Sequence, residues 1–158
     1  MGVVLDSSVV LKALLPPPRN LKGEILKREL ETHEKCRFVL ERIEEERIET
    51  HSPAVIVVEV AGVIRRITGD EYRASIASDT IENNFILHYD AEILEKAREV
   101  ATLTGASGFD AYFIATARLL SLPLITDDKG MHLRARELGI DSILVREKSI
   151  KEIERTLG

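Results

Sequence analysis

The sequence predicts an α/β domain of three layers, in which helices cover both faces of a mostly parallel sheet of about five strands. Short apolar runs alternate with helical segments along the chain, and strands that are joined through helices run parallel. The apolar runs, such as residues 2–5 and 142–145, lack polar alternation. That pattern is typical of strands covered on both faces.

The expected strands are 2–5, 47–51, 85–88, 123–126 and 142–145. The expected helices are 8–15, two helices within 21–46 that break near Thr32 and His33, then 54–67, 71–82, 91–104, 109–120, 129–138 and 150–157. Three prolines at 16–18 end the first helix, because consecutive prolines cannot continue one. The helix over 54–67 is apolar nearly all round, which predicts that it is buried.

Length and composition indicate one domain over residues 1–158, with residues 16–50 as a helical extension of it. The chain has 158 residues, of which 44% are hydrophobic and 31% charged, enough for a real core. Cys36 is the single cysteine, which favours a reducing compartment. With no signal peptide or membrane span evident, we expect a soluble, cytoplasmic protein with no membrane partner.

Three acidic sites stand where parallel strands end or the following helices begin. Asp6 directly follows the first strand, Asp127 and Asp128 follow the fourth, and Asp110 lies in the first turn of a helix. Each has an ordinary explanation as a helix cap, a turn former or a partner of the helix dipole. Taken singly, these positions therefore do not establish a functional site.

Glu59 is harder to explain in ordinary terms, because it lies within the apolar helix over 54–67. An unpaired buried carboxylate costs several kcal/mol or takes up a proton. Arg66 lies two helical turns away, roughly 10 Å, which is too far for a local pair. A partner on another helix would remove the cost, and so would a metal ion.

The acidic positions can converge at one edge of a parallel sheet, with Glu59 reaching in from a flanking helix. Clustered carboxylates repel one another, and a hard divalent cation relieves that repulsion. Such a cation can activate water and stabilise a leaving oxygen of a phosphate ester. The candidate ligands of Mg²⁺ or Mn²⁺ are Asp6, Glu59, Asp110, Asp127 and Asp128. A bound cation would also weaken the objection that a net charge of −5 raises against a nucleic-acid partner.

The order and spacing of four segments resemble the PIN domain, and more narrowly the VapC-like toxins of toxin–antitoxin pairs. The segments are residues 3–9, 53–61, 108–117 and 122–128, and the resemblance covers nearly the whole chain. It implies a three-layer PIN-like fold and a metal-dependent ribonuclease. The segment over 16–46 is longer than in compact members, which leaves the antitoxin contacts open.

By this resemblance, the catalytic acids are Asp6, Glu59, Asp110 and Asp128. The fourth acid of the family falls two residues after the threonine, and Asp127 could take its place. Ser7 would be the family hydroxyl after the first acid, and Thr126 would support the fourth acid. The resemblance further implies a homodimer and a small antitoxin that fills the acidic groove.

The RNA substrate would meet a rim of cations around the acids, namely Arg65, Arg66, Lys129 and Arg134. Cations at helix ends also have an ordinary dipole explanation. A phosphatase with an aspartyl nucleophile is the second hypothesis, although Ser8 stands where such a site would want a second aspartate. The third is a PIN-fold scaffold that binds RNA or a partner without catalysis.

Overall fold

The computed structural model describes residues 2–158 and contains a five-stranded sheet in which every pairing is parallel. The strands are β1 (Gly2–Leu5), β2 (Glu49–Pro53), β3 (Ile86–His88), β4 (Leu124–Thr126) and β5 (Ser142–Leu144). Their order across the sheet is β3-β2-β1-β4-β5. The predicted α/β class and the number of strands are therefore confirmed.

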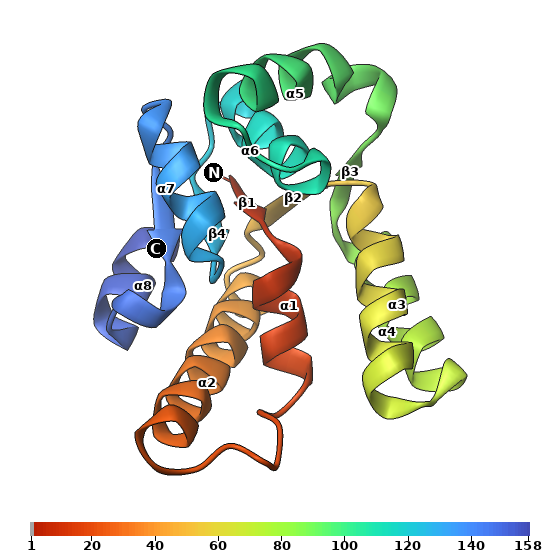
Figure 1. The fold of residues 1–158 in the computed structure, drawn as a ribbon, viewed down its shortest axis with the longest axis vertical. Helices are drawn as coiled ribbons and strands as arrows, with labels where there is room; N and C mark the ends of the chain where they lie inside the picture. The colour runs from red at the N-terminus through yellow and green to blue at the C-terminus, as the bar shows by residue number, and fades with distance from the viewer. Residues whose placement is uncertain (1) are drawn as a thin grey trace.

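Helices form a layer on each side of this sheet. They are α1 (Ser7–Leu14), α2 (Gly23–Glu45), α3 (Val55–Thr68), α4 (Glu71–Asn84), α5 (Asp90–Thr104), α6 (Gly108–Leu120), α7 (Lys129–Glu137) and α8 (Ile150–Leu157), with a 3-10 turn at Val145–Glu147. In Figure 1, α5 and α6 lie above the strands and α1 and α2 lie below them. The predicted three-layer arrangement is confirmed.

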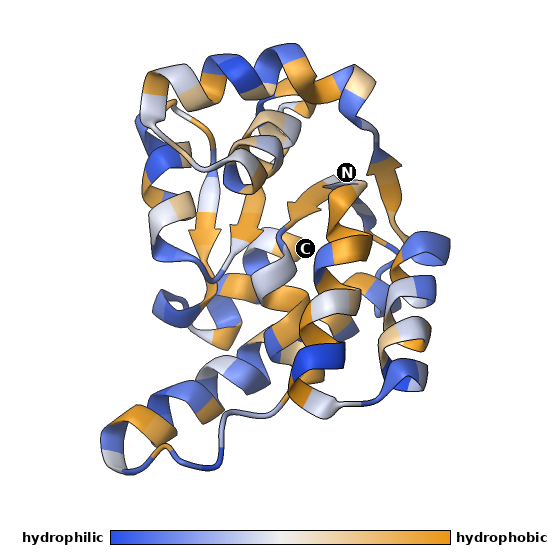
Figure 2. Cartoon of the chain, turned by 45° about the vertical axis from the view of Figure 1, so that its right-hand side comes forward, coloured by the Kyte–Doolittle hydropathy of each residue, from blue (hydrophilic) through white to orange (hydrophobic). Residues whose placement is uncertain are grey.

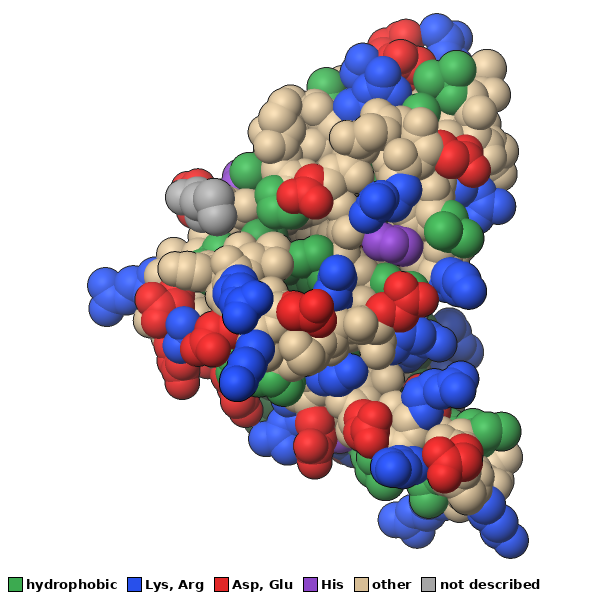
Figure 3. Space-filling model, turned by 90° about the vertical axis from the view of Figure 1, so that its left-hand side faces the viewer, with side chains coloured by type: hydrophobic (Ala, Val, Ile, Leu, Met, Phe, Trp, Pro, Cys, Tyr) green, Lys and Arg blue, Asp and Glu red, His purple; other side chains and the backbone are tan. Residues whose placement is uncertain are grey.

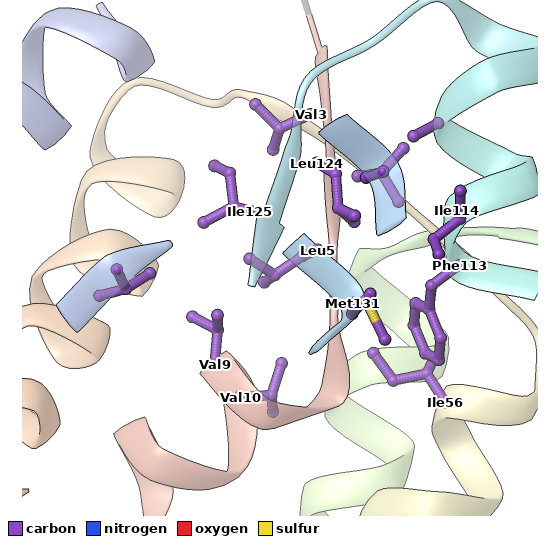
Figure 4. Close-up of a cluster of buried hydrophobic side chains, with 14 of the residues drawn as sticks. Val3, Leu5, Val9, Val10, Ile56, Phe113, Ile114, Leu124, Ile125 and Met131 are labelled. Atoms are coloured by element: carbon purple, nitrogen blue, oxygen red, sulfur yellow. The ribbon is translucent and has the colours of Figure 1, made fainter. Parts of the chain in front are cut away.

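The core lies on both faces of the central strands β1 and β4. Figure 4 shows Leu5 between Ile125 of β4 and Val9 of α1, and Phe113 of α6 beside Ile56 of α3. All five side chains are buried. Figure 2 shows the strands in hydrophobic colours and the outer helices in mixed ones. Full burial of each large side chain contributes about 1.5–3 kcal/mol, which fixes the strand ends that carry the acids.

The expected break within residues 21–46 is wrong, because α2 is one continuous helix. Thr32, Cys36 and Val39 are buried at helical spacing and carry the apolar face through the predicted break. The Thr32 hydroxyl donates to the Arg28 carbonyl, and the His33 ring bonds the Lys12 carbonyl of α1. A bond within the helix at Thr32 and a tertiary bond at His33 thus satisfy these two polar side chains, and the helix continues where their composition suggests an interruption.

The expectation that α3 is buried all round is also wrong. Ile56, Val60 and Ile64 face the interior, but Val58 is 70% exposed and Ile67 is 66% exposed. The helix packs against α4 and α1 along one side, and its other side faces solvent.

No helix within residues 2–158 is both long enough and apolar enough to cross a bilayer.

A pair of histidines with nearly parallel rings joins β2 to the edge strand β3. His51 Nδ1 lies 2.9 Å from His88 Nε2, and the ring centroids are 5.2 Å apart, so one N–H···N bond links them. His88 Nδ1 lies 3.2 Å from Glu92 on α5. Burial and the adjacent His88 ring lower the pKa of His51.

We predict that this pair destabilises the fold in acid. Because the His51 pKa is lowered, the unfolded chain takes up a proton near the ordinary histidine pKa of about 6.5 before the folded chain does. The free energy of unfolding should then fall more between about pH 7.5 and 5.5 in the wild type than in His51→Asn, as urea denaturation would measure. Equal losses in the two proteins would contradict a shared-proton pair.

Candidate functional site

The candidate site lies where the strand order reverses. The chain passes from β1 to β2 on one side, and from β4 to β5 on the other, although β1 and β4 are direct neighbours. In open parallel sheets, ligands bind beyond the carboxyl ends of the strands at such a point. Asp6 follows β1, and Asp127 and Asp128 follow β4, so these acids flank that position.

Asp6 is buried and held by hydroxyl groups. Its Oδ2 accepts hydrogen bonds from Ser8 Oγ at 2.6 Å and from Thr126 Oγ1 at 2.7 Å, and Ser7 Oγ lies 3.3 Å from Oδ1. Asp6 occupies the N-cap position of α1, but its side chain makes no capping bond, so the ordinary explanation does not apply. Burial raises the pKa of Asp6, the two hydroxyl bonds lower it, and the Asp128 charge raises it.

Glu59 points from α3 toward the same place, and one of its oxygens is unsatisfied. Its Oε1 is buried without a hydrogen-bond partner among the described residues. Burial, and then the charges of Asp6 and Asp110, raise the pKa of Glu59 to about 7, while the Ser7 hydroxyl lowers it. Glu59 is therefore an acid that readily holds a proton or would readily accept a cation.

Asp110 completes the group from the first turn of α6, where it is half-buried. Burial raises its pKa, and the charges of Asp128 and Asp6 raise it further, whereas Arg134 and the Ser107 hydroxyl lower it. Asp6, Glu59, Asp110 and Asp128 are close enough for their charges to act on one another's pKa values, although they come from four separate segments of the sequence. We call this group the acid cluster.

Asp127 and Asp128 have different environments although they are adjacent. The Asp127 side chain is fully buried and is bound by Lys12 and by the Arg146 guanidinium, with Nη2–Oδ2 at 2.9 Å and Nε–Oδ1 at 3.2 Å. Its charge is thus neutralised within the fold. Asp128 is exposed and caps α7, where its Oδ1 accepts from Met131 N at 3.0 Å. This arrangement favours Asp128 over Asp127 as the fourth acid.

The sequence did not predict three of the residues that bind Asp6 and Asp127, namely Lys12, Arg146 and Ser8. Lys12 and Arg146 carry no local signal, because they meet Asp127 only in the folded chain. Ser8, rather than Ser7, makes the shorter bond to Asp6, and its oxygen also accepts from Asp127 N at 3.0 Å. The Ser7–Ser8 doublet is a signal that a hydroxyl serves Asp6, but it does not say which one.

Thr126 links the two strand ends directly. Its hydroxyl donates to Asp6 and accepts from the backbone N–H of Asp128 at 3.0 Å. One side chain therefore sets the first acid and the fourth acid relative to each other. The family resemblance pointed to Thr126 as a support for the fourth acid, and the geometry adds the bond to the first.

The four cations expected around the site lie at different distances from the acid cluster. Arg65 and Arg66 are in the last turn of α3, about 9–10 Å along the helix from Glu59. Lys129 is exposed at the start of α7, and Arg134 is close enough to Asp110 to lower its pKa. Figure 3 shows basic and acidic side chains interspersed over the face with α7 and α8, rather than one basic patch.

The acid cluster fits a divalent metal ion in its donor chemistry. Within residues 2–158, no three carboxylate, imidazole or thiol side chains are close enough to hold one ion between them. Magnesium, however, is usually bound through one or two carboxylates and keeps several waters. The buried, unpartnered Glu59 Oε1 and the mutually raised pKa values of three acids are features that a cation would relieve.

Comparison with known proteins identifies the family. The PIN domain family matches residues 3–137, and the chain therefore belongs to it. The fold is similar to a chain in the crystal structure of FitAcB from Neisseria gonorrhoeae, with a TM-score of 0.55 and 19% sequence identity. That similarity covers 89% of this chain and 96% of the other. A search of curated proteins finds no match.

The two adjacent aspartates should respond oppositely to replacement by asparagine. Asp128→Asn should weaken Mn²⁺ binding with little change in stability, because asparagine caps a helix as well as aspartate does. Asp127→Asn should cost about 2–3 kcal/mol, because Lys12 and Arg146 lose their charge partner, and should leave Mn²⁺ affinity unchanged. Calorimetric Mn²⁺ titration and urea denaturation would measure both, and a reversed pattern would make Asp127 the ligand.

Repulsion within the acid cluster should appear as a pH dependence of the metal-free protein. The folded pKa of Glu59 is raised from 4.5 to about 7, so the folded chain keeps a proton that the unfolded chain has released. Stability is therefore lost as pH rises through this range. At about pH 8, Glu59→Gln should be more stable than the wild type by about 1–2 kcal/mol, allowing for solvent screening of a half-buried group.

The control for this prediction is the same pair of proteins at about pH 4.5, where Glu59 is protonated in the folded wild type and the difference should vanish. Saturating Mg²⁺ at about pH 8 should stabilise the wild type more than Glu59→Gln. If Glu59→Gln were less stable than the wild type at both pH values, Glu59 would have a satisfied structural role.

Proposed function

We propose that this PIN domain is a divalent-metal-dependent ribonuclease that cleaves RNA phosphodiester bonds, as the toxin of a VapBC-type toxin–antitoxin pair in the cytoplasm. PIN domains are generally nucleases and generally use divalent metal ions. The observation that carries the proposal is the gathering of Asp6, Glu59, Asp110 and Asp128 at the point where the strand order reverses.

The residues of the cluster would divide the work by their environments. Asp6 is held by Ser8 and Thr126 in one orientation, so it and Asp110 would be the principal ligands of Mg²⁺ or Mn²⁺. A bound divalent ion supplies activation of water and stabilisation of the leaving oxygen. Glu59 and Asp128 would bind a second ion or position the attacking water.

Substrate and protein partners belong to the same proposal. Lys129 is the first residue of α7, and Arg134 lies just after its first turn. Both would contact RNA phosphates near the cluster. Arg65 and Arg66, at the far end of α3, would contact RNA only away from the cleaved bond. Mixed charges on the face with α7 and α8 favour few, local phosphate contacts over a long basic track.

An apolar groove supports an antitoxin as a partner, whereas a second copy of the chain as a partner rests on the family resemblance. A groove of about 790 Å³ lies between the α1–α2 pair and α4, lined by apolar residues that include Leu14, Ile43 and Ile76. It is suited to an amphipathic segment of a small antitoxin, as a contact additional to the acidic groove that the family resemblance implies.

The decisive experiment compares the wild type with Asp6→Asn on single-stranded RNA. We expect cleavage by the wild type in Mg²⁺ or Mn²⁺, none in EDTA, and a loss of about a thousandfold or more in Asp6→Asn, since the first acid is removed without changing shape. Asp79→Asn, an exposed acid on α4, makes the same charge change away from the site and should cleave normally. Cleavage that survives in nuclease-free Asp6→Asn would defeat the assignment.

A non-catalytic scaffold is the alternative that this experiment separates. If the wild type binds RNA but neither Mg²⁺ nor Mn²⁺ produces cleavage or raises its melting temperature, the fold serves binding alone. The unsatisfied Glu59 Oε1 argues against that outcome, because a site without a cation gains nothing from a buried, unpartnered carboxylate.

A further inference from the structure

Arg134 occupies an unusual place one helical turn after Gly130 on α7. Its Nη1 lies 3.0 Å from the point where a Gly130 Cβ would stand, and Asp128 Oδ1 lies 3.3 Å from that same point. The side chain thus runs back over the first turn of the helix, as helical side chains tend to do. The missing Cβ at Gly130 leaves the space in which the guanidinium and the capping acid approach each other.

Arg134 is also a cation whose charge is not used within the fold. It is close enough to Asp110 to lower the pKa of that acid, yet among residues 2–158 it makes no ion pair within 4.0 Å. Arg146 and Lys12, on the other side of the same loop, are bound to Asp127. Arg134 is a half-buried residue beside Asp110 and Asp128, and its guanidinium donors remain available to an anion.

We propose that Arg134 is the phosphate-binding residue of this site, with its guanidinium donating to a non-bridging oxygen of the RNA phosphate that lies against the acid cluster, and that Gly130 keeps the space for it. This inference rests on the proposed ribonuclease function and adds the residue that holds the reacting phosphate. A cluster of carboxylates repels a phosphodiester, so a bound metal ion alone leaves part of the substrate charge unmatched.

Arginine suits this task because its planar fork matches two phosphate oxygens. The ordinary explanation, a cation that complements the carboxyl end of α7, applies equally to Arg136. Arg136 is exposed, lies two residues further on, and acts on His132 rather than on the acids. Arg136 is therefore a matched control that has the same charge and the same helix but lacks the position beside the cluster.

The test uses the full chain with Mn²⁺ and a single-stranded RNA oligonucleotide in single-turnover cleavage. Arg134→Ala should cleave about 100-fold more slowly than the wild type, and Arg134→Lys about tenfold more slowly, because lysine keeps the charge but not the fork. Arg136→Ala should match the wild type. Mn²⁺ affinity of Arg134→Ala should be equal or higher, because a cation has been removed from beside the acids.

Gly130→Ala gives a second, independent test that does not remove a functional group. Alanine at Gly130 should leave stability unchanged or higher, while its Cβ would crowd both the Arg134 guanidinium and Asp128 Oδ1 and slow cleavage about tenfold. Unchanged Mn²⁺ affinity in this variant would assign the slowing to Arg134 rather than to Asp128. A variant that is at least as stable but less active cannot be explained by misfolding. Full activity in Gly130→Ala together with full activity in Arg134→Ala would overturn the inference.

Other outcomes are equally decisive. Weaker Mn²⁺ binding in Arg134→Ala would show that Arg134 positions Asp110 rather than phosphate, and would overturn the inference while leaving the ribonuclease proposal intact. Equal slowing in Arg134→Ala and Arg136→Ala would reduce Arg134 to general charge attraction and would also overturn it. Absence of cleavage in the wild type itself defeats the ribonuclease proposal instead.

Discussion

The mutual repulsion of the acid cluster, in which Asp6 is buried, Glu59 and Asp110 are half-buried and Asp128 is exposed, is the constraint around which the rest of the site is arranged. The strands that carry Asp6 and Asp128 are held in place by an apolar core on both faces, so these acids cannot move apart freely. The hydroxyls of Ser8 and Thr126 stabilise the Asp6 charge, while Glu59 is left to hold a proton near neutral pH. The stored repulsion is energy that a divalent cation can recover on binding.

The fold pairs Asp127 with two cations and leaves its neighbour Asp128 without one in the described chain. Asp127 is bound by Lys12 from α1 and Arg146 from the 3-10 turn, and its backbone N–H bonds Ser8, which in turn bonds Asp6. The backbone of Asp127 therefore supports the orientation of the first acid through Ser8, while its side chain is held by the two cations. Asp128, one residue on, faces the cluster without a cation within ion-pair distance in the described chain.

Much of this arrangement could be predicted from local pattern, and the remainder depends on tertiary contacts. The ends of β1 and β4 follow from apolar runs that stop at aspartates, and Glu59 is conspicuous because a carboxylate interrupts an apolar helix. The choice between Asp127 and Asp128 could not be made in the sequence, since the partners of Asp127 lie far away in the chain. The continuity of α2 and the exposed side of α3 likewise depend on which neighbours pack against them.

The net charge of −5 and an RNA substrate are compatible if attraction is local rather than global. A long basic surface would bind RNA tightly at many places and give strong salt dependence, and Figure 3 shows no such surface over α7 and α8. Under the proposed function, the Arg134 guanidinium beside the acid cluster would instead concentrate favourable charge at the one phosphate that reacts. Binding energy is then realised where charge develops in the transition state, and the acidic remainder of the protein disfavours unproductive contacts.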